Sequence, residues 1–287
     1  MNGPDLADPA VPPSPTGRQL IRRHSATVRL THWLNVLCLS VLLLSGLQIF
    51  NAHPRLYWGK YGADADKAFI AIGSKQEGSA LRGFFQIGPA RIETTGVLGV
   101  SEEDGNATAR AFPTWLTIPS YHDLGAGRRW HFFFAWLLVF NGLIYLAHGI
   151  WRKHFQRDLI PSRDQLAPRH LWHEIRDHAR LHFARGEDAR RYNALQKLSY
   201  VAVIFVLLPL MVLTGLTMSP GIDAAFPFLP NLFGGRPSAR TLHFITASLL
   251  VLFVVVHVVM VIASGLWNNL RSMISGRYAI DVDGDSP

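Results

Sequence analysis

Histidines at the ends of long apolar runs are the residues of this sequence with the clearest chemistry. Thirteen histidines are present among the 287 residues. An ionisable side chain inside a bilayer is costly, so it needs a partner or a function. Imidazole is a frequent ligand of metals and of haem iron. Five histidines lie within or at the edge of apolar runs: His32, His131, His148, His243 and His257.

One apolar run carries two of these histidines. His243 and His257 are 14 residues apart. In an α-helix this spacing stops about 40° short of whole turns and rises about 21 Å. Both side chains should therefore project from nearly the same face, one near each side of a membrane. A single helix with this pattern can offer one ligand to each of two stacked cofactors.

Four membrane-spanning helices are needed to position these residues. The sequence is 49% hydrophobic and 17% charged, whereas an average soluble domain has about 25% charged residues. Each run approaches the roughly 20 residues that cross the hydrocarbon core. The predicted fold class is an all-α membrane protein, a four-helix transmembrane bundle. The expected spans are 31–50, 130–151, 198–218 and 241–266.

The distribution of Lys and Arg predicts the orientation of the bundle. Segment 152–197 holds 11 basic and 6 acidic residues, and segment 51–127 holds 7 basic and 8 acidic residues. Because basic connections stay on the cytoplasmic side, both termini should be cytoplasmic. The long loop 51–127 should be periplasmic, and the protein should reside in a bacterial inner membrane. This topology accounts for the sequence pI of about 10.0, and no basic–aromatic pattern predicts a nucleic-acid partner.

Depth in the membrane divides four of the histidines into two pairs. With this topology, His32 and His257 lie near the cytoplasmic surface, and His131 and His243 lie near the outer surface. Each pair can supply two axial ligands, so two haems b are the expected cofactors. Two imidazoles leave no open position on the iron, which favours electron transfer. The alternative for any single histidine is a hydrogen-bonded packing residue. His148 projects about 100° away from His131, which favours a polar or quinone-side role.

The haems should be of type b because the chain has one cysteine, Cys38. A single cysteine excludes a CxxCH attachment site.

Arginines and glycines near the proposed ligands suggest further cofactor contacts. Arg29, Arg128 and Arg240 each precede a proposed ligand by three residues. A guanidinium at the membrane edge could pair with a haem propionate; alternatively, these arginines mark topology alone. Gly46 and Gly215 fall at the depth of the outer pair. They could allow a macrocycle to approach the backbone, or serve ordinary helix packing.

The predicted organisation has three parts. Residues 1–29 form a disordered cytoplasmic tail, 30–268 a di-haem cytochrome b domain, and 269–287 a second cytoplasmic tail. Loop 51–127 and connection 152–197 belong to the central domain. The loop is long and rich in aromatic residues, which is typical of functional loops. It is predicted to be a docking cap for another protein; the alternative is a self-folded lid.

Three features of the sequence resemble the bacterial cytochrome b561 superfamily. They are the segment RLTHWLNVLCLSVLLLSGLQIF, the Arg-x-x-His motifs of spans two and four, and the segment RYNALQK before span three. The closest resemblance is to the membrane cytochrome b subunits of formate dehydrogenases and nickel–iron hydrogenases. It implies the same four ligands that depth selects. It also implies a quinone near the cytoplasmic haem, with Asn193 and Gln196 as candidate hydrogen-bonding residues. The alternative for these two is a polar helix start.

The outer loop departs from those subunits. Its segments HPRLYWGKYG and IPSYHDLGAGRRWHFFFAW resemble a subgroup associated with periplasmic molybdopterin oxidoreductases of the sulfite-oxidase type. The expected function is a lipid-embedded respiratory-chain cytochrome b that transfers electrons between the quinone pool and such an enzyme. The alternatives are a stand-alone quinol oxidoreductase and a haem-free anchor or transporter. A histidine-rich metal transporter is disfavoured because its ligands would gather at one depth.

Overall fold

The computed structural model describes residues 17–63, 66–103, 105–153, 155–180 and 193–282. It contains four helices long and apolar enough to cross a membrane, which confirms the four predicted spans. These helices begin four to six residues before the expected spans, because the apolar runs are preceded by polar first turns. Their bounds are Ala26–Asn51 (α1), Leu124–Trp151 (α2), Ala194–Thr217 (α4 to α5) and Arg236–Ala263 (α8).

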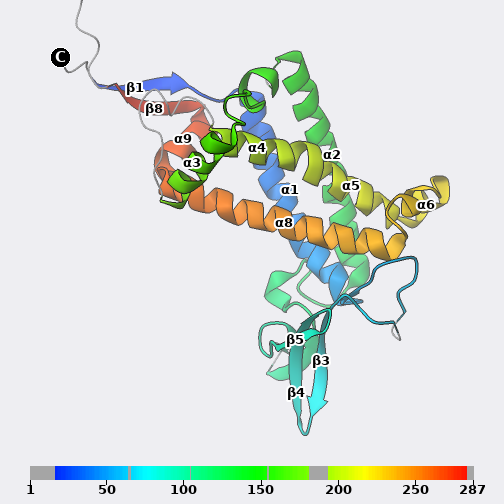
Figure 1. Ribbon diagram of the computed structural model, residues 1–287. Helices are drawn as coiled ribbons and strands as arrows, with labels where there is room; N and C mark the ends of the chain where they lie inside the picture. Colours follow the sequence, from blue (N-terminus) through cyan, green and yellow to red (C-terminus); the bar gives the residue numbers. More distant parts are fainter. Residues whose placement is uncertain (1–16, 64–65, 104, 154, 181–192, 283–287) are drawn as a thin grey trace, which may run out of the picture.

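The four spans are arranged as two crossing pairs. Helix α1 packs along α2, and α5 packs along α8. Figure 1 shows α8 passing across α1 and α2. A buried amide joins the first pair: Asn141 donates from its Nδ2 to the carbonyl of Thr31 (2.8 Å) and to Oδ1 of Asn35 (2.7 Å). Such interhelical hydrogen bonds fix the register of membrane helices, which gain little from apolar contact alone.

The third span is interrupted by one wider turn. Helix α4 (Ala194–Ala202) continues through a π-helical segment, Val203–Leu207, into α5 (Leu208–Thr217). Pro209 follows at the start of α5. Proline lacks an N–H group and its ring clashes with the preceding turn, so a locally widened helix accommodates it.

Loop 51–127 folds into strands, which the all-α prediction did not include. One antiparallel sheet has the order β2–β3–β4–β5, and β6 pairs with β7 in a separate hairpin. All-α therefore describes the membrane part only. The strands lie beyond one end of α1 (Figure 1). Their bounds are Arg55–Leu56 (β2), Ile70–Glu77 (β3), Ala80–Ile87 (β4), Ala90–Glu93 (β5), Gly99–Glu103 (β6) and Asn106–Arg110 (β7).

A small apolar core joins this loop to the end of α1. Phe50 of α1 packs on Phe112 of the loop and on Phe244 of α8, with ring centroids 5.7 and 5.0 Å apart. Leu56 and Ile72 are almost fully buried in the same cluster. The loop is thus a folded cap on the helix ends.

The opposite end of the bundle carries a two-stranded sheet made from the first and last described segments. Strand β1 (Gly17–Arg22) pairs antiparallel with β8 (Arg277–Val282), and both lie near α9 (Leu266–Ser275; Figure 1). A disordered tail was expected through residue 29, but the structure has β1 and the first turn of α1 there. Pairing with a segment more than 250 residues away supplies the hydrogen bonds that a lone tail lacks. Residues 1–16 lie outside the described residues.

Short elements complete the connections. Within the described residues, they are Thr114–Leu116 (η1), the π-helical turn Phe155–Leu159 (η2), Pro168–Ala179 (α3), Pro220–Ala225 (α6), Leu229–Leu232 (α7) and Leu266–Ser275 (α9).

Candidate functional site

The structure brings the predicted histidines together in two pairs. His131 of α2 faces His243 of α8, with ring centroids 6.3 Å apart. His32 of α1 faces His257 of α8, with ring centroids 6.4 Å apart. These are the pairs that depth predicted. We call His131 and His243 the outer pair, because they lie towards the loop, and His32 and His257 the inner pair.

The spacing of each pair suits a metal held between two imidazoles. Two imidazoles on opposite sides of one metal, with bonds of about 2 Å, have ring centres about 6 Å apart. Among the residues that the structure describes, no three His, Cys, Asp or Glu side chains gather into a group that could hold a metal ion. Two facing imidazoles are the protein ligands that a bis-histidine haem requires, since its macrocycle supplies the other four nitrogens. The donor set fits haem.

Glycines leave room for the outer imidazoles. A Cβ added at Gly46 would lie 3.4 Å from Cε1 of His131, and a Cβ at Gly215 would lie 3.4 Å from Cε1 of His243. The sequence placed both glycines at the depth of the outer pair and left open whether they admit a macrocycle or serve helix packing. In the structure each glycine lies against the imidazole of one outer histidine.

Two hydroxyl groups that sequence reasoning missed contact the outer pair. Oγ of Ser45 lies 3.1 Å from Nδ1 of His131, and Oγ1 of Thr214 lies 3.0 Å from Nδ1 of His243. Both hydroxyl residues are fully buried. A signal was present in the sequence, because Leu-Ser-Gly-Leu at 44–47 recurs as Leu-Thr-Gly-Leu at 213–216.

The inner pair has different neighbours. Phe253 stacks on the His257 ring with centroids 5.8 Å apart and 18° between the planes. Nδ1 of His32 is buried and has no hydrogen-bond partner within the described residues. Cys38 of the same helix as His32 is fully buried as a free thiol.

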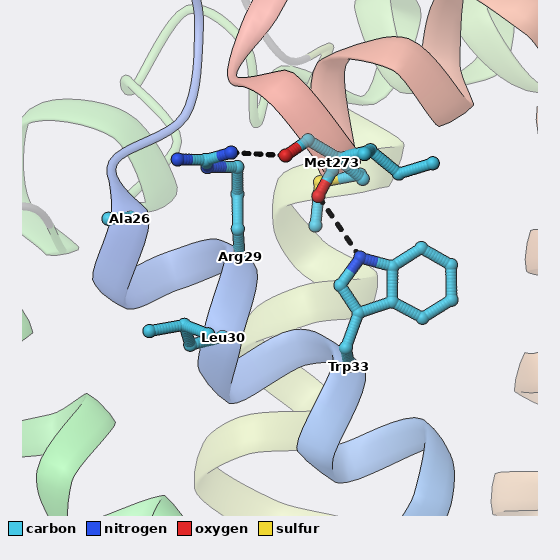
Figure 2. Close-up of a pocket in the computed structure, with 6 residues that line it drawn as sticks. Ala26, Arg29, Leu30, Trp33 and Met273 are labelled. Carbon is cyan, nitrogen blue, oxygen red and sulfur yellow. Dashed lines mark hydrogen bonds between the residues drawn. The ribbon is translucent and has the colours of Figure 1, made fainter.

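The arginines before the ligands bind the protein backbone. Arg240 donates to the carbonyls of His53 (2.5 Å) and Arg55 (3.3 Å), which fastens the loop to α8. Arg29 donates to the carbonyl of Ile274 in α9, beside a cavity of about 280 Å³ (Figure 2). Arg128 is exposed, and its guanidinium lies 5.5 Å from the Phe132 ring centroid. Arg29 and Arg240 thus have structural roles besides any contact with propionates.

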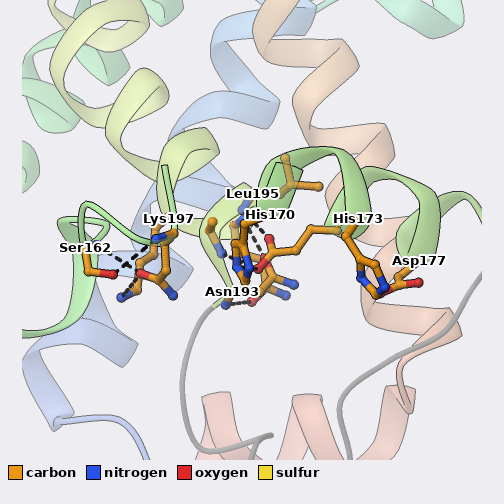
Figure 3. A network of polar contacts seen from close by, with 11 residues as sticks. Ser162, His170, His173, Asp177, Asn193, Leu195 and Lys197 are labelled. Carbon is orange, nitrogen blue, oxygen red and sulfur yellow. Dashed lines mark hydrogen bonds and ion pairs between the residues drawn. The ribbon is translucent and has the colours of Figure 1, made fainter. Parts of the chain in front are cut away.

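Asn193 and Gln196 form a capping box at the start of α4. The Asn193 side chain accepts from the Gln196 N–H (2.8 Å), and the Gln196 side chain accepts from the Asn193 N–H (3.4 Å). Glu174 of α3 accepts from the N–H groups of Ala194 (3.2 Å) and Leu195 (3.0 Å). Figure 3 shows this network. The polar helix start, which was the alternative interpretation, is therefore present.

His148 belongs to neither histidine pair. It lies in the last turn of α2, half-buried, and its backbone carbonyl accepts from the N–H of Arg152 at 2.9 Å. Its role stays a prediction.

Comparison with known proteins supports the same assignment. A model of the prokaryotic cytochrome b561 family matches residues 23–276, which include all four spans and both histidine pairs. The chain is 28% identical over 244 residues to the putative protein-methionine-sulfoxide reductase subunit YedZ1 of Azospira oryzae, covering 85% of this chain and 92% of that protein. No solved structure was found to match. The chain belongs to the prokaryotic cytochrome b561 family of membrane haem b proteins.

Proposed function

We propose that this protein is a di-haem cytochrome b that carries electrons between the quinone pool and an oxidoreductase docked on loop 51–127. The observation that carries the proposal is the pair of facing histidines at each of two levels, with ring centroids 6.3 and 6.4 Å apart. Because α8 contributes one histidine to each pair, a single helix would set the distance between the two centres.

Haem b supplies one-electron transfer when it is bound. The residues of each pair would fill both axial positions, which excludes dioxygen and substrate from the iron. The spacing of His243 and His257 along α8 would place the two haem centres about 21 Å apart along the helix axis.

The orientation of the protein follows from charge and from the paired chain ends. Strands β1 and β8, which pair near the two ends of the sequence, lie at the end of the bundle opposite the loop. With the basic connection 152–197 on the cytoplasmic side, the inner pair faces the cytoplasm of a bacterial inner membrane. The folded loop then projects into the periplasm, where a soluble oxidoreductase can reach the outer pair.

The loop surface offers large exposed aromatic side chains for a partner. Tyr61 is 83% exposed and Trp115 is 76% exposed. Aromatic anchors of this kind dominate the binding energy of many protein interfaces. The relative from Azospira oryzae is named as a reductase subunit. We therefore propose a periplasmic molybdopterin oxidoreductase as the partner, with protein methionine sulfoxide as a candidate substrate of that partner.

Quinone is proposed to exchange electrons at the inner pair. Asn193 and Gln196 lie at the start of α4, at the same end of the bundle as the paired termini. Their amide groups can hydrogen-bond a quinone carbonyl in addition to capping the helix, because each amide has more than one hydrogen-bonding site.

A haem count with a reduced-minus-oxidised spectrum tests the central proposal. We expect about two haems b per purified chain, about one in H257A with only the outer centre left, and about one in H131A with only the inner centre left. H148A, which changes a histidine outside both pairs, should keep both. A chain without haem, or an unchanged count in H257A and H131A, would contradict the proposal.

Co-purification tests the partner. The protein is isolated from membranes of its own host with and without W115A, and the associated polypeptides are assayed for molybdopterin. Trp267 of α9 is 82% exposed at the other end of the bundle, so W267A is the matched control. Loss of a molybdopterin protein in W115A alone supports docking on the loop. A wild-type chain that oxidises quinol without any associated polypeptide would instead indicate the stand-alone oxidoreductase.

A further inference from the structure

Each outer histidine contacts a hydroxyl group whose single hydrogen is already donated to a backbone carbonyl. Oγ of Ser45 donates to the carbonyl of Val41 at 2.6 Å, and Oγ1 of Thr214 donates to the carbonyl of Leu210 at 2.6 Å. A hydroxyl has one hydrogen and two acceptor lone pairs. With that hydrogen committed to the short bond along its own helix, each oxygen can only accept from the neighbouring imidazole.

The contact with each hydroxyl fixes the tautomer of the imidazole. Because the hydroxyl oxygen beside Nδ1 can only accept, Nδ1 carries the proton, and Nε2 keeps the lone pair that binds a metal.

The same arrangement occurs once in each helix pair. Ser45 and Gly46 of α1 contact the imidazole of His131 in α2. Thr214 and Gly215 of α5 contact the imidazole of His243 in α8. In both places the hydroxyl precedes a glycine, whose missing side chain lets the imidazole approach the helix. Two independent occurrences of one geometry make an accidental contact a poor explanation.

In the inner pair, His32 lacks such a hydroxyl contact at Nδ1. Nδ1 of His32 is buried without a hydrogen-bond partner in the part of the chain that the structure describes. Hydrogen bonding from the distal nitrogen of a metal-bound imidazole raises its basicity as a ligand. A more basic ligand stabilises the ferric state over the ferrous state, which lowers the reduction potential.

The geometry points to Ser45 and Thr214 as positioning residues that fix the tautomer of the outer ligands and lower the potential of the outer haem. This assignment rests on the proposed function, since it requires a haem between His131 and His243. It predicts that the two haems differ in reduction potential, a difference that the positions of the four histidines alone do not predict.

Redox titration of the full chain in membranes tests the assignment, with optical and EPR detection of each haem. The outer signals are identified by their loss in H131A. T214V removes the hydroxyl and keeps the side-chain volume, whereas T214S keeps the hydroxyl. S45A removes the corresponding hydroxyl on α1, so the effect on the outer haem can be measured at either hydroxyl. Ser40 also bonds back along α1, to the Val36 carbonyl at 2.8 Å, but is exposed, so S40A is the matched control.

We expect T214V and S45A to change the ferric-to-ferrous affinity ratio of the outer haem about tenfold, which raises its potential by about 59 mV for a one-electron couple. The EPR g-values of that haem should shift, while T214S, S40A and the inner haem stay at wild-type values. Equal potentials in T214V, T214S and wild type overturn the assignment, as does an equal shift of both haems. A wild-type chain lacking the outer haem overturns the haem pairing as well, and the haem count separates these two failures.

Discussion

The outer and inner histidine pairs have nearly equal ring spacing but are supported by different neighbours. In the outer pair both Nδ1 atoms contact hydroxyl oxygens, at 3.1 and 3.0 Å, and both imidazoles lie against glycines. In the inner pair, Phe253 stacks on His257 and Nδ1 of His32 has no partner among the described residues. The two pairs therefore share one spacing, whereas the side chains behind their rings differ.

The two ends also differ in how the polypeptide closes them. A folded loop covers the outer end, and Gly59, His53 and Arg55 of that loop bind Ser238 and Arg240 of α8. The inner end is closed by α9, the β1–β8 pair and the start of α4. The proposed protein partner would dock on the folded outer end, and the proposed quinone would bind among the short elements of the inner end.

The largest effect is expected from adding bulk beside the outer pair. A Cβ at Gly46 already meets His131 at 3.4 Å, so the two further methyl groups of G46V must displace the ring. G46V should therefore lose the outer haem and keep the inner one, as measured by the haem count. Gly142 of α2 has no atom within 4 Å of its added Cβ, so G142V is the control. Retention of both haems in G46V would show that the outer ligands do not depend on this close approach.

A second large effect should follow loss of the buried arginine that ties the loop to α1. Arg110 bonds Gln48 (2.8 Å), Thr117 (2.9 Å) and Glu103 (2.6 Å). Hydrogen bonds to a charged group contribute about 1.5–3 kcal/mol each, and removing the arginine leaves buried groups unpaired. We expect R110A to destabilise the loop by about 3 kcal/mol, with faster hydrogen exchange in 51–127.

The control for that substitution is an exposed ion pair in the same loop. Arg82 and Glu93 are 2.9 Å apart and more than half exposed, so R82A should cost less than about 1 kcal/mol. Faster exchange around α4 in R110A, as large as that in the loop, would mean that the two ends do not unfold separately.

The role of Asn193 can be divided between capping and quinone binding. N193A should destabilise α4 by about 1 kcal/mol, because it removes the N-cap. N193D keeps a good N-cap but removes the amide donor, so it should keep the stability and lower the rate of quinol oxidation. Thermal unfolding and quinol kinetics on both variants make the measurement. Wild-type kinetics in N193D would remove Asn193 from the quinone site.

The smallest effect is expected from the ring behind His257. Its stacking on Phe253 has the geometry of aromatic pairs that contribute about 0.5–1.5 kcal/mol. F253L keeps an apolar side chain of similar reach, so it should weaken retention of the inner haem slightly and leave the outer haem unchanged. The rate of haem loss from each centre checks this. Equal losses from both centres would argue that Phe253 supports the bundle as a whole rather than one pair.

The sequence by itself determined the membrane architecture and the partners of the histidines. Hydropathy depends on local composition, so the four runs identified the four spans. Helical rise and rotation are fixed, so the 14-residue interval in α8 placed His243 and His257 at two levels. Charge then supplied the depth of the remaining histidines, and the structure has His32 beside His257 and His131 beside His243.

Only the tertiary structure decided what stands behind each ligand and how the loop folds. Ser45 and His131 are 86 positions apart in the sequence, and Arg22 pairs with Arg277 across the whole chain. Such contacts depend on how helices cross and how strands pair, and no local period encodes them. The capping box at Asn193 was readable as a helix start, but its bond partners required the fold of α3 beside α4. Local physics therefore placed the ligands, and long-range packing gave the two pairs their different surroundings.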